Sequence, residues 1–172
     1  MLTTLMNAEP GSPLPYTDTK LVGAADFYFA LNATFRFIER KLGKDALHRY
    51  WQDLGTRYYA PVTTQWRAGG LRAVADYWRA FFKAEPGAEV TVEQLADEVV
   101  IEVKTCPIIE HLRDNQRAIM PDFCEHCYFV SEAMAQPAGL CARISGGNGR
   151  CTQRFSTQAL PPQDINSITR CA

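Results

Sequence analysis

The chain has 172 residues, of which 47% are hydrophobic and 11% aromatic, and this predicts one soluble globular domain with its own core. Its 18 basic and 19 acidic side chains give a net charge of −1 without a basic block, so we expect no nucleic-acid partner. No run reaches the roughly 18 apolar residues of a membrane span, and the first 20 residues do not resemble a secretory signal. We therefore expect no membrane association, a cytoplasmic location and reduced cysteines.

Apolar residues at helical spacing dominate the first half of the chain. The predicted segments are a proline-rich extended arm over 1–20 and helices over about 21–42, 45–59 and 70–83. Gly43 is expected to end the first helix and Pro61 to break the second. Aromatic side chains on these helices are expected to form the core, to line a ligand pocket or to form the face of a homo-oligomer.

Alternation of apolar and polar residues predicts strands in the second half. Val90 and Val92 indicate one strand, and Val99, Ile101 and Val103 a second, joined by a turn over 94–97. Further predicted segments are helices beginning near residues 106 and 122, a hairpin over 139–155 and a surface tail over 157–172. The predicted fold class is α+β, a single domain over 21–156 in which N-terminal helices pack on a small antiparallel sheet with two inserted helices.

Residues 105–155 contain five of the six cysteines. Asp122 followed by Glu125 has the spacing of a capping box, which would place Cys124 in the first turn of a helix. Cys127 would then lie on the same side of that helix and face the core. Cys106 precedes Pro107 and is expected at the start of another helix. Free amides at a helix N-terminus stabilise a thiolate, so both positions suit reactive cysteines.

The glycine-rich stretch before Cys151 predicts a hairpin turn. A two-residue loop at Asn148-Gly149 and a four-residue loop both turn Cys151 inward, whereas a three-residue loop would turn it outward. With an inward Cys151, the thiols of Cys124, Cys127 and Cys151 are expected to converge.

A thiolate nucleophile is one function that this pattern indicates. It requires a cysteine of low pKa, a proton carrier and a group that holds the substrate. The candidates are Cys106 and Cys124 as thiolates, Glu125, His126 and His111 as proton carriers, and Arg143 as a carboxylate anchor. His126 lies two positions after Cys124 in the sequence, which puts these side chains on different sides of a helix.

Metal binding and thiol redox chemistry are alternative readings of the same cysteines. Cys106, Cys124, Cys127 and Cys151 could hold zinc or an iron–sulfur cluster, although only one pair is closely spaced. A redox pair of Cys124 and Cys127 is a third reading. Simple burial of the cysteines in the core is the fourth.

A family resemblance favours the enzyme reading. The order of Cys106, Phe123-Cys124, Arg143, Gly147, Cys151 and Phe155 resembles the L-2-amino-thiazoline-4-carboxylic acid hydrolase family over about residues 98–156. This resemblance implies a cysteine-dependent hydrolase of a small C–N or C–S substrate, such as a cyclic amidine or isothiourea carboxylate. The second half is also similar to 4-vinyl-reductase-type domains, which implies a small-ligand pocket near the cysteines. A non-enzymatic module that binds a small ligand or a metal is therefore the alternative.

Overall fold

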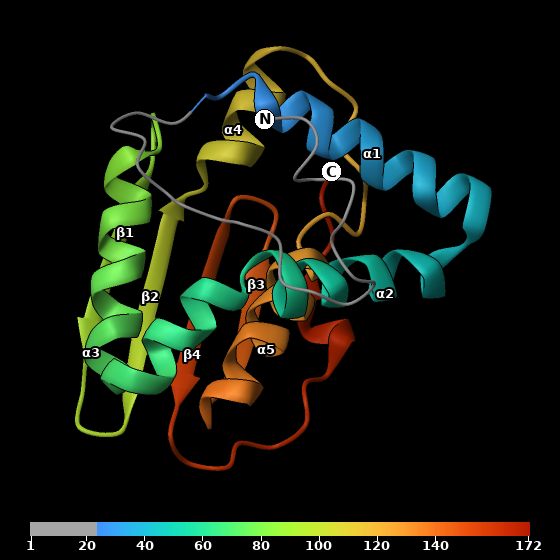
Figure 1. Ribbon diagram of the computed structural model, residues 1–172. Helices are drawn as coiled ribbons and strands as arrows, with labels where there is room; N and C mark the ends of the chain where they lie inside the picture. The colour runs from blue at the N-terminus through green and yellow to red at the C-terminus, as the bar shows by residue number, and fades with distance from the viewer. Residues whose placement is uncertain (1–23) are drawn as a thin grey trace, which may run out of the picture.

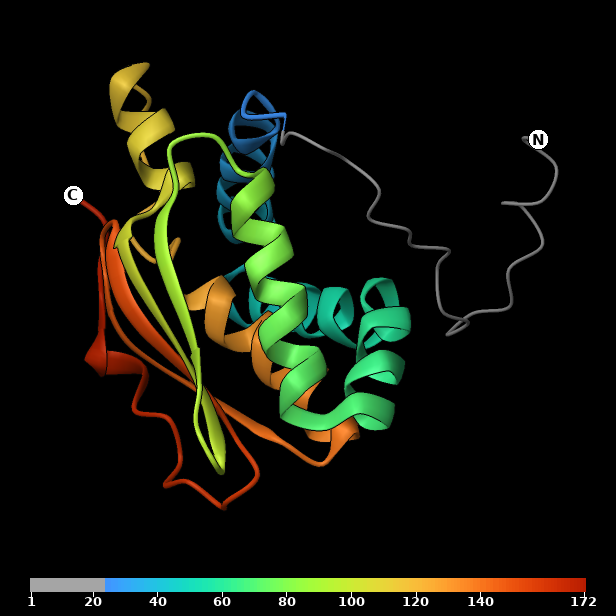
Figure 2. The ribbon, with the colours of Figure 1, turned by 90° about the vertical axis from the view of Figure 1, so that its left-hand side faces the viewer.

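A five-stranded sheet with helices on one face makes up residues 24–172, the part of the chain that the computed structural model describes (Figure 1). Figure 2 shows the sheet nearly edge-on, with α1, α2, α3 and α5 on one side of it. The predicted α+β class is therefore confirmed. The predicted arm over 1–20 and the first residues of the predicted first helix lie outside the described residues.

Along the chain, a group of helices is followed by a group of strands, and this order occurs twice. The helices are α1 Phe27–Leu42, α2 Lys44–Asp53, α3 Ala60–Ala84, α4 Pro107–Asp114 and α5 Glu125–Ala135, with a π-helical turn at Leu54–Tyr58. The strands are β1 Glu89–Gln94, β2 Glu98–Thr105, β3 Cys141–Gly147, β4 Arg150–Ser156 and β5 Ile168–Thr169. Short 3-10 helices occupy Gln136–Ala138 and Ile165–Ser167. No helix within residues 24–172 is both long and apolar enough to cross a membrane.

The helical half follows the predicted pattern with two differences. Gly43 ends α1 with a positive φ of 85°, as expected. Pro61 does not end a helix but lies in the first turn of α3, where its missing N–H leaves no bond unmade. α3 consequently begins ten residues before the predicted start and is kinked at Gly70.

The sheet has the strand order β1-β2-β4-β3-β5, antiparallel except for the parallel pairing of β3 with β5. The prediction that 157–172 form a surface tail is wrong, because β5 joins the sheet and Cys171 is buried. Gly147 permits this pairing, since a Cβ there would collide with the carbonyl oxygen of Thr169. A two-residue strand is too short to show alternation in the sequence.

Two hydrophobic clusters share the space between sheet and helices. One joins α3, α5 and the sheet around Trp66, Met134 and Phe155, and the other joins α1, α2 and α4 around Phe35 and Trp51. Cys106 and Val130 pack against both clusters. The boundary between the clusters is where the cavity described next is found.

Candidate functional site

A cavity of about 690 Å³ lies between the two hydrophobic clusters. Its walls come from α1, the π-helical turn, α3, α5 and the inward face of the sheet. Most lining side chains are apolar, and the aromatic ones among them are Phe27, Tyr28, Phe35, Tyr50, Tyr58, Tyr59, Tyr77, Trp78, Phe81 and Phe82. The volume is within the range of about 300–1,000 Å³ that is typical of small-molecule sites.

Four thiols line this one cavity: Cys106, Cys124, Cys127 and Cys151. In the hairpin, Gly146 pairs with Cys151 across the Asn148-Gly149 loop, which confirms the two-residue loop and turns Cys151 inward. Asn148 and Gly149 both have positive φ, 53° and 99°, as a tight hairpin turn requires. The inward orientation of Cys151 is thus confirmed, and Cys124, Cys127 and Cys151 lie in the wall of the same cavity.

Cys106 is the N-cap residue of α4, as predicted, with Pro107 in the first turn. The position does not yield a thiolate, because burial raises the pKa of Cys106 to about 11. The backbone amides of Ile109 and Ile108 act in the opposite direction but are outweighed. Burial likewise raises the pKa of Cys151 to about 12. At neutral pH both are uncharged thiols in the wall of an apolar cavity.

The start of α5 differs from the predicted capping box. Cys124 is its N-cap residue, and no side chain of the described residues caps the helix by a hydrogen bond there. Asp122 instead forms ion pairs with Lys44 at 2.9 Å and Arg170 at 2.7 Å. Burial alone would raise the pKa of Asp122, but these two cations outweigh it and lower the pKa. The carboxylate therefore holds α2, the start of α5 and the segment after β5 together.

Glu125 is not brought to the cavity. Its carboxylate is buried, forms an ion pair with Lys44 at 2.8 Å and is hydrogen-bonded to His48 Nε2 at 3.0 Å. The ring of His48 stacks on Phe129 with a centroid distance of 4.1 Å. Glu125 thus links α5 to α2 and does not line the cavity with the thiols.

His126 and Cys127 meet at the cavity wall. The Phe123 carbonyl oxygen, 2.6 Å away, accepts a hydrogen bond from His126 Nδ1, so Nε2 carries the lone pair. The Cys127 sulfur lies 3.7 Å from Nε2. Burial lowers the pKa of His126 to about 4 and raises that of Cys127 well above its usual value. His126 is therefore a neutral imidazole at pH 7, and its neighbouring thiol is Cys127.

Cys124 has a partner that sequence reasoning missed. Its sulfur lies 3.5 Å from the sulfur of Cys171, and the backbone N–H of Asn148 donates to it at 3.3 Å. The hydrogen bond between the two thiols raises the pKa of Cys124 and lowers that of Cys171, as expected when one proton is shared. Cys171 is held in place by its N–H, which donates to the Pro121 carbonyl oxygen at 2.7 Å.

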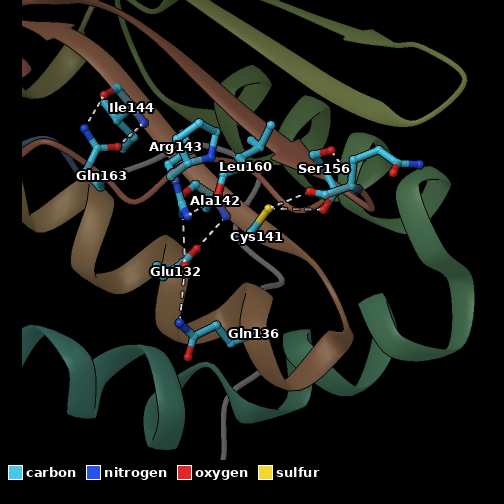
Figure 3. Close-up of polar contacts among 11 residues, drawn as sticks. Glu132, Gln136, Cys141, Ala142, Arg143, Ile144, Ser156, Leu160 and Gln163 are labelled. Carbon is cyan, nitrogen blue, oxygen red and sulfur yellow. Dashed lines mark hydrogen bonds and ion pairs between the residues drawn. The ribbon is translucent and has the colours of Figure 1, made fainter.

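Arg143 does not line the cavity. Its guanidinium forms an ion pair with Glu132 of α5 at 3.0 Å and donates to the carbonyl oxygens of Leu160 and Pro161 (Figure 3). These bonds attach the segment after β4 to β3 and α5. The nearby Cys141 donates to the Gln158 carbonyl oxygen, so it too belongs to this structural contact rather than to the thiol cluster.

Three polar groups in the cavity wall were not among the predicted site residues. Gln153 is buried, and within residues 24–172 neither its Oε1 nor the buried Nε1 of Trp78 has a hydrogen-bond partner. Arg150 lines the cavity, is exposed, and forms no ion pair with another residue of 24–172. The signal for Gln153 was available in the hairpin pattern, because its pairing with Ile144 placed a polar residue on an otherwise apolar face.

The metal reading does not fit the donor geometry. Among residues 24–172, no group of three or more His, Cys, Asp or Glu side chains is arranged to hold a metal ion. Cys106, Cys124, Cys127 and Cys151 surround a cavity rather than a single point. The residues present therefore do not form a zinc or iron–sulfur site.

Comparisons of the chain with family models, with curated proteins and with solved structures gave no match. The resemblances noted in the sequence therefore stay predictions, and the geometry of the cavity carries the functional argument.

Proposed function

We propose that the protein binds a small, flat and mostly apolar molecule in the cavity between its two hydrophobic clusters. The observation that carries this proposal is an aromatic cavity of about 690 Å³ whose lining residues include Gln153 and Trp78, each with a buried polar atom that has no hydrogen-bond partner within residues 24–172. A buried polar atom without a hydrogen bond costs about 1–3 kcal/mol, so a bound ligand that supplies the missing bond recovers this cost.

The polar atoms restrict the chemistry of the ligand. Gln153 Oε1 needs a donor and Trp78 Nε1 needs an acceptor, so the ligand carries both kinds of group. Arg150 adds a positive charge that suits an anionic substituent. An aromatic or heterocyclic acid has this combination. The uncharged thiols of Cys106 and Cys151 complete a soft, apolar wall.

Replacing Gln153 with leucine should weaken binding without destabilising the fold. As a probe we choose anilinonaphthalene sulfonate, an apolar dye with an N–H donor and an anionic group. We expect about a fivefold higher Kd for Gln153→Leu, because a neutral hydrogen bond contributes about 1 kcal/mol. The melting temperature should stay equal or rise, because the variant buries no unpaired amide.

Gln136→Leu serves as the matched control, since Gln136 is exposed and lies outside the cavity. Dye titration and thermal unfolding of both variants separate the two roles of Gln153. A large loss of stability with unchanged dye affinity would show that Gln153 serves the fold and not a ligand.

A cysteine-dependent hydrolase is the second candidate, and the position of Cys124 favours it. The Cys124 sulfur lines the cavity, receives the Asn148 N–H and lies 3.5 Å from the Cys171 sulfur. A carboxylate substrate, such as a cyclic amidine or isothiourea acid, would find its cation in Arg150. Of the predicted proton carriers, His126 is the one that lines the cavity.

Cys124→Ser is expected to abolish turnover of a cyclic thioamidine carboxylate while leaving the far-ultraviolet circular dichroism spectrum unchanged. The reason is that a serine hydroxyl at this place is a far weaker nucleophile than a thiol. Cys141→Ser is the control, because Cys141 lies outside the cavity. Turnover at the wild-type rate by Cys124→Ser would exclude the nucleophile role, and binding of the substrate analogue would then be tested alone.

A further inference from the structure

We propose that Cys124 and Cys171 form a redox-active dithiol, which a hydroperoxide converts into a disulfide. This site goes beyond the binding function proposed above and does not depend on the identity of the ligand. It also differs from the Cys124 and Cys127 pair that the sequence indicated.

The two sulfurs are already in contact. They lie 3.5 Å apart in hydrogen-bond geometry, and no other pair of the six cysteines, all within residues 24–172, forms a sulfur–sulfur hydrogen bond. A disulfide requires a separation of about 2.05 Å, so the sulfurs must approach by about 1.5 Å. Cys127, by contrast, contacts the ring of His126 rather than the Cys124 sulfur.

The backbone around the pair fixes both partners without joining them covalently. Cys124 belongs to the start of α5 and Cys171 to the segment after β5. The N–H of Cys171 donates to the Pro121 carbonyl oxygen, and the N–H of Ala172 donates to Asn148 Oδ1 at 3.2 Å. The Asn148 N–H in turn donates to the Cys124 sulfur. This set of bonds presents the two sulfurs to each other in the folded chain.

The chemistry follows from the contact between the two sulfurs, with Cys171 as the attacking thiolate. The Cys171 thiolate attacks one oxygen of the hydroperoxide, the O–O bond breaks, and the products are a Cys171 sulfenic acid and an alkoxide or hydroxide. The Cys124 thiol then attacks this sulfur, the S–O bond breaks, and water leaves. The Cys124 proton and the leaving hydroxyl form that water. The two sulfurs are oxidised by two electrons in total, and the hydroperoxide is reduced.

Oxidation would also change the cavity. Cys124 lines it, so a disulfide to Cys171 removes a free thiol from the wall and ties the segment after β5 to the start of α5. If Cys124 acts as a nucleophile, oxidation switches that activity off. The redox site thereby supplies a reversible control that a dithiol reductant releases.

The test is oxidation of the full chain by one equivalent of hydrogen peroxide, followed by mass spectrometry. We expect loss of two hydrogen atoms from the intact mass and a single cross-linked peptide pair that contains Cys124 and Cys171. Dithiothreitol should restore the original mass. A cross-link between Cys124 and Cys127, or oxygen addition without any cross-link, would overturn the proposal.

Four variants make the assignment specific. Cys171→Ser and Cys124→Ser should lose the cross-link completely, whereas Cys127→Ser and Cys141→Ser should form it at the wild-type rate. A cross-link of equal yield in Cys171→Ser would overturn the proposal. The readout needs no ligand, so its failure leaves the proposed binding function standing, and failure of dye binding leaves the disulfide standing.

Discussion

The wild-type protein is expected to lose up to roughly 3 kcal/mol of unfolding free energy as the pH falls from about 6.5 to 4, and the variant His126→Asn is expected not to show this loss. Burial lowers the pKa of the folded-state imidazole to about 4, whereas an exposed histidine in the unfolded chain titrates near 6.5. As the pH falls through this window, the unfolded chain takes up a proton that the folded chain does not. The free energy of unfolding therefore decreases as the pH decreases. The contribution of the neutral His126 ring is fully present only above about pH 6.5.

Asparagine is the informative replacement because its amide can donate to the Phe123 carbonyl oxygen, as Nδ1 does, but it does not titrate in this window. The measurement is urea unfolding of both proteins at intervals from pH 7.5 down to 4.5. Asp122, whose folded pKa is lowered, contributes stability that is present above about pH 4 and is lost below it, so its effect lies outside this range. Parallel curves for the two proteins would show that His126 is not buried as a neutral ring.

Filling the cavity is the second change with a large expected effect. Cys151 points inward from β4 and lines the cavity, with the small Gly146 as its partner on β3. In Cys151→Trp the indole ring should occupy the ligand space, and we expect the affinity for anilinonaphthalene sulfonate to fall at least about tenfold, since a bulky ring in the site excludes the dye sterically. Fluorescence titration gives the Kd, and circular dichroism reports the fold.

Thr152→Trp is the matched control, because adjacent side chains of a strand point to opposite faces and Thr152 does not line the cavity. It should bind the dye as the wild type does. The smaller Cys151→Phe variant should give an intermediate affinity, which keeps the test informative if tryptophan disturbs the sheet. Equal dye affinity in all three variants would place the dye outside this cavity and contradict the proposed site.

Local sequence signals predicted much of the second half of the chain. The Asn148-Gly149 turn and the alternation on both sides of it were sufficient for the register that turns Cys151 inward. Pro107 after an alternating strand was sufficient for Cys106 as a helix N-cap. These features depend on neighbours within a few residues, so the local order of residue types is enough to predict them.

The same local reasoning failed where distant segments compete for one side chain. Asp122 and Glu125 have the spacing of a capping box, but Lys44 and Arg170 offer them charged partners, and His48 a hydrogen bond, from other elements. In the structure both carboxylates bind these cations, and no side chain of residues 24–172 caps α5. Arg143 likewise had the appearance of a carboxylate anchor, and its partners are Glu132 and backbone carbonyls.

By itself, the sequence determined an α+β fold and the inward orientation of Cys151. Only the tertiary structure decided which thiols touch. Cys127 is three residues from Cys124, yet the partner of Cys124 is Cys171, which the pairing of β5 with β3 brings to the start of α5. The physical reason is that a sulfur–sulfur contact requires two residues to lie within a few ångströms in space. The two-residue strand β5, which brings Cys171 there, is too short to be recognised from alternation in the sequence. The sulfur–sulfur contact of Cys124 thus depends on a segment that the sequence pattern alone predicted to be a surface tail.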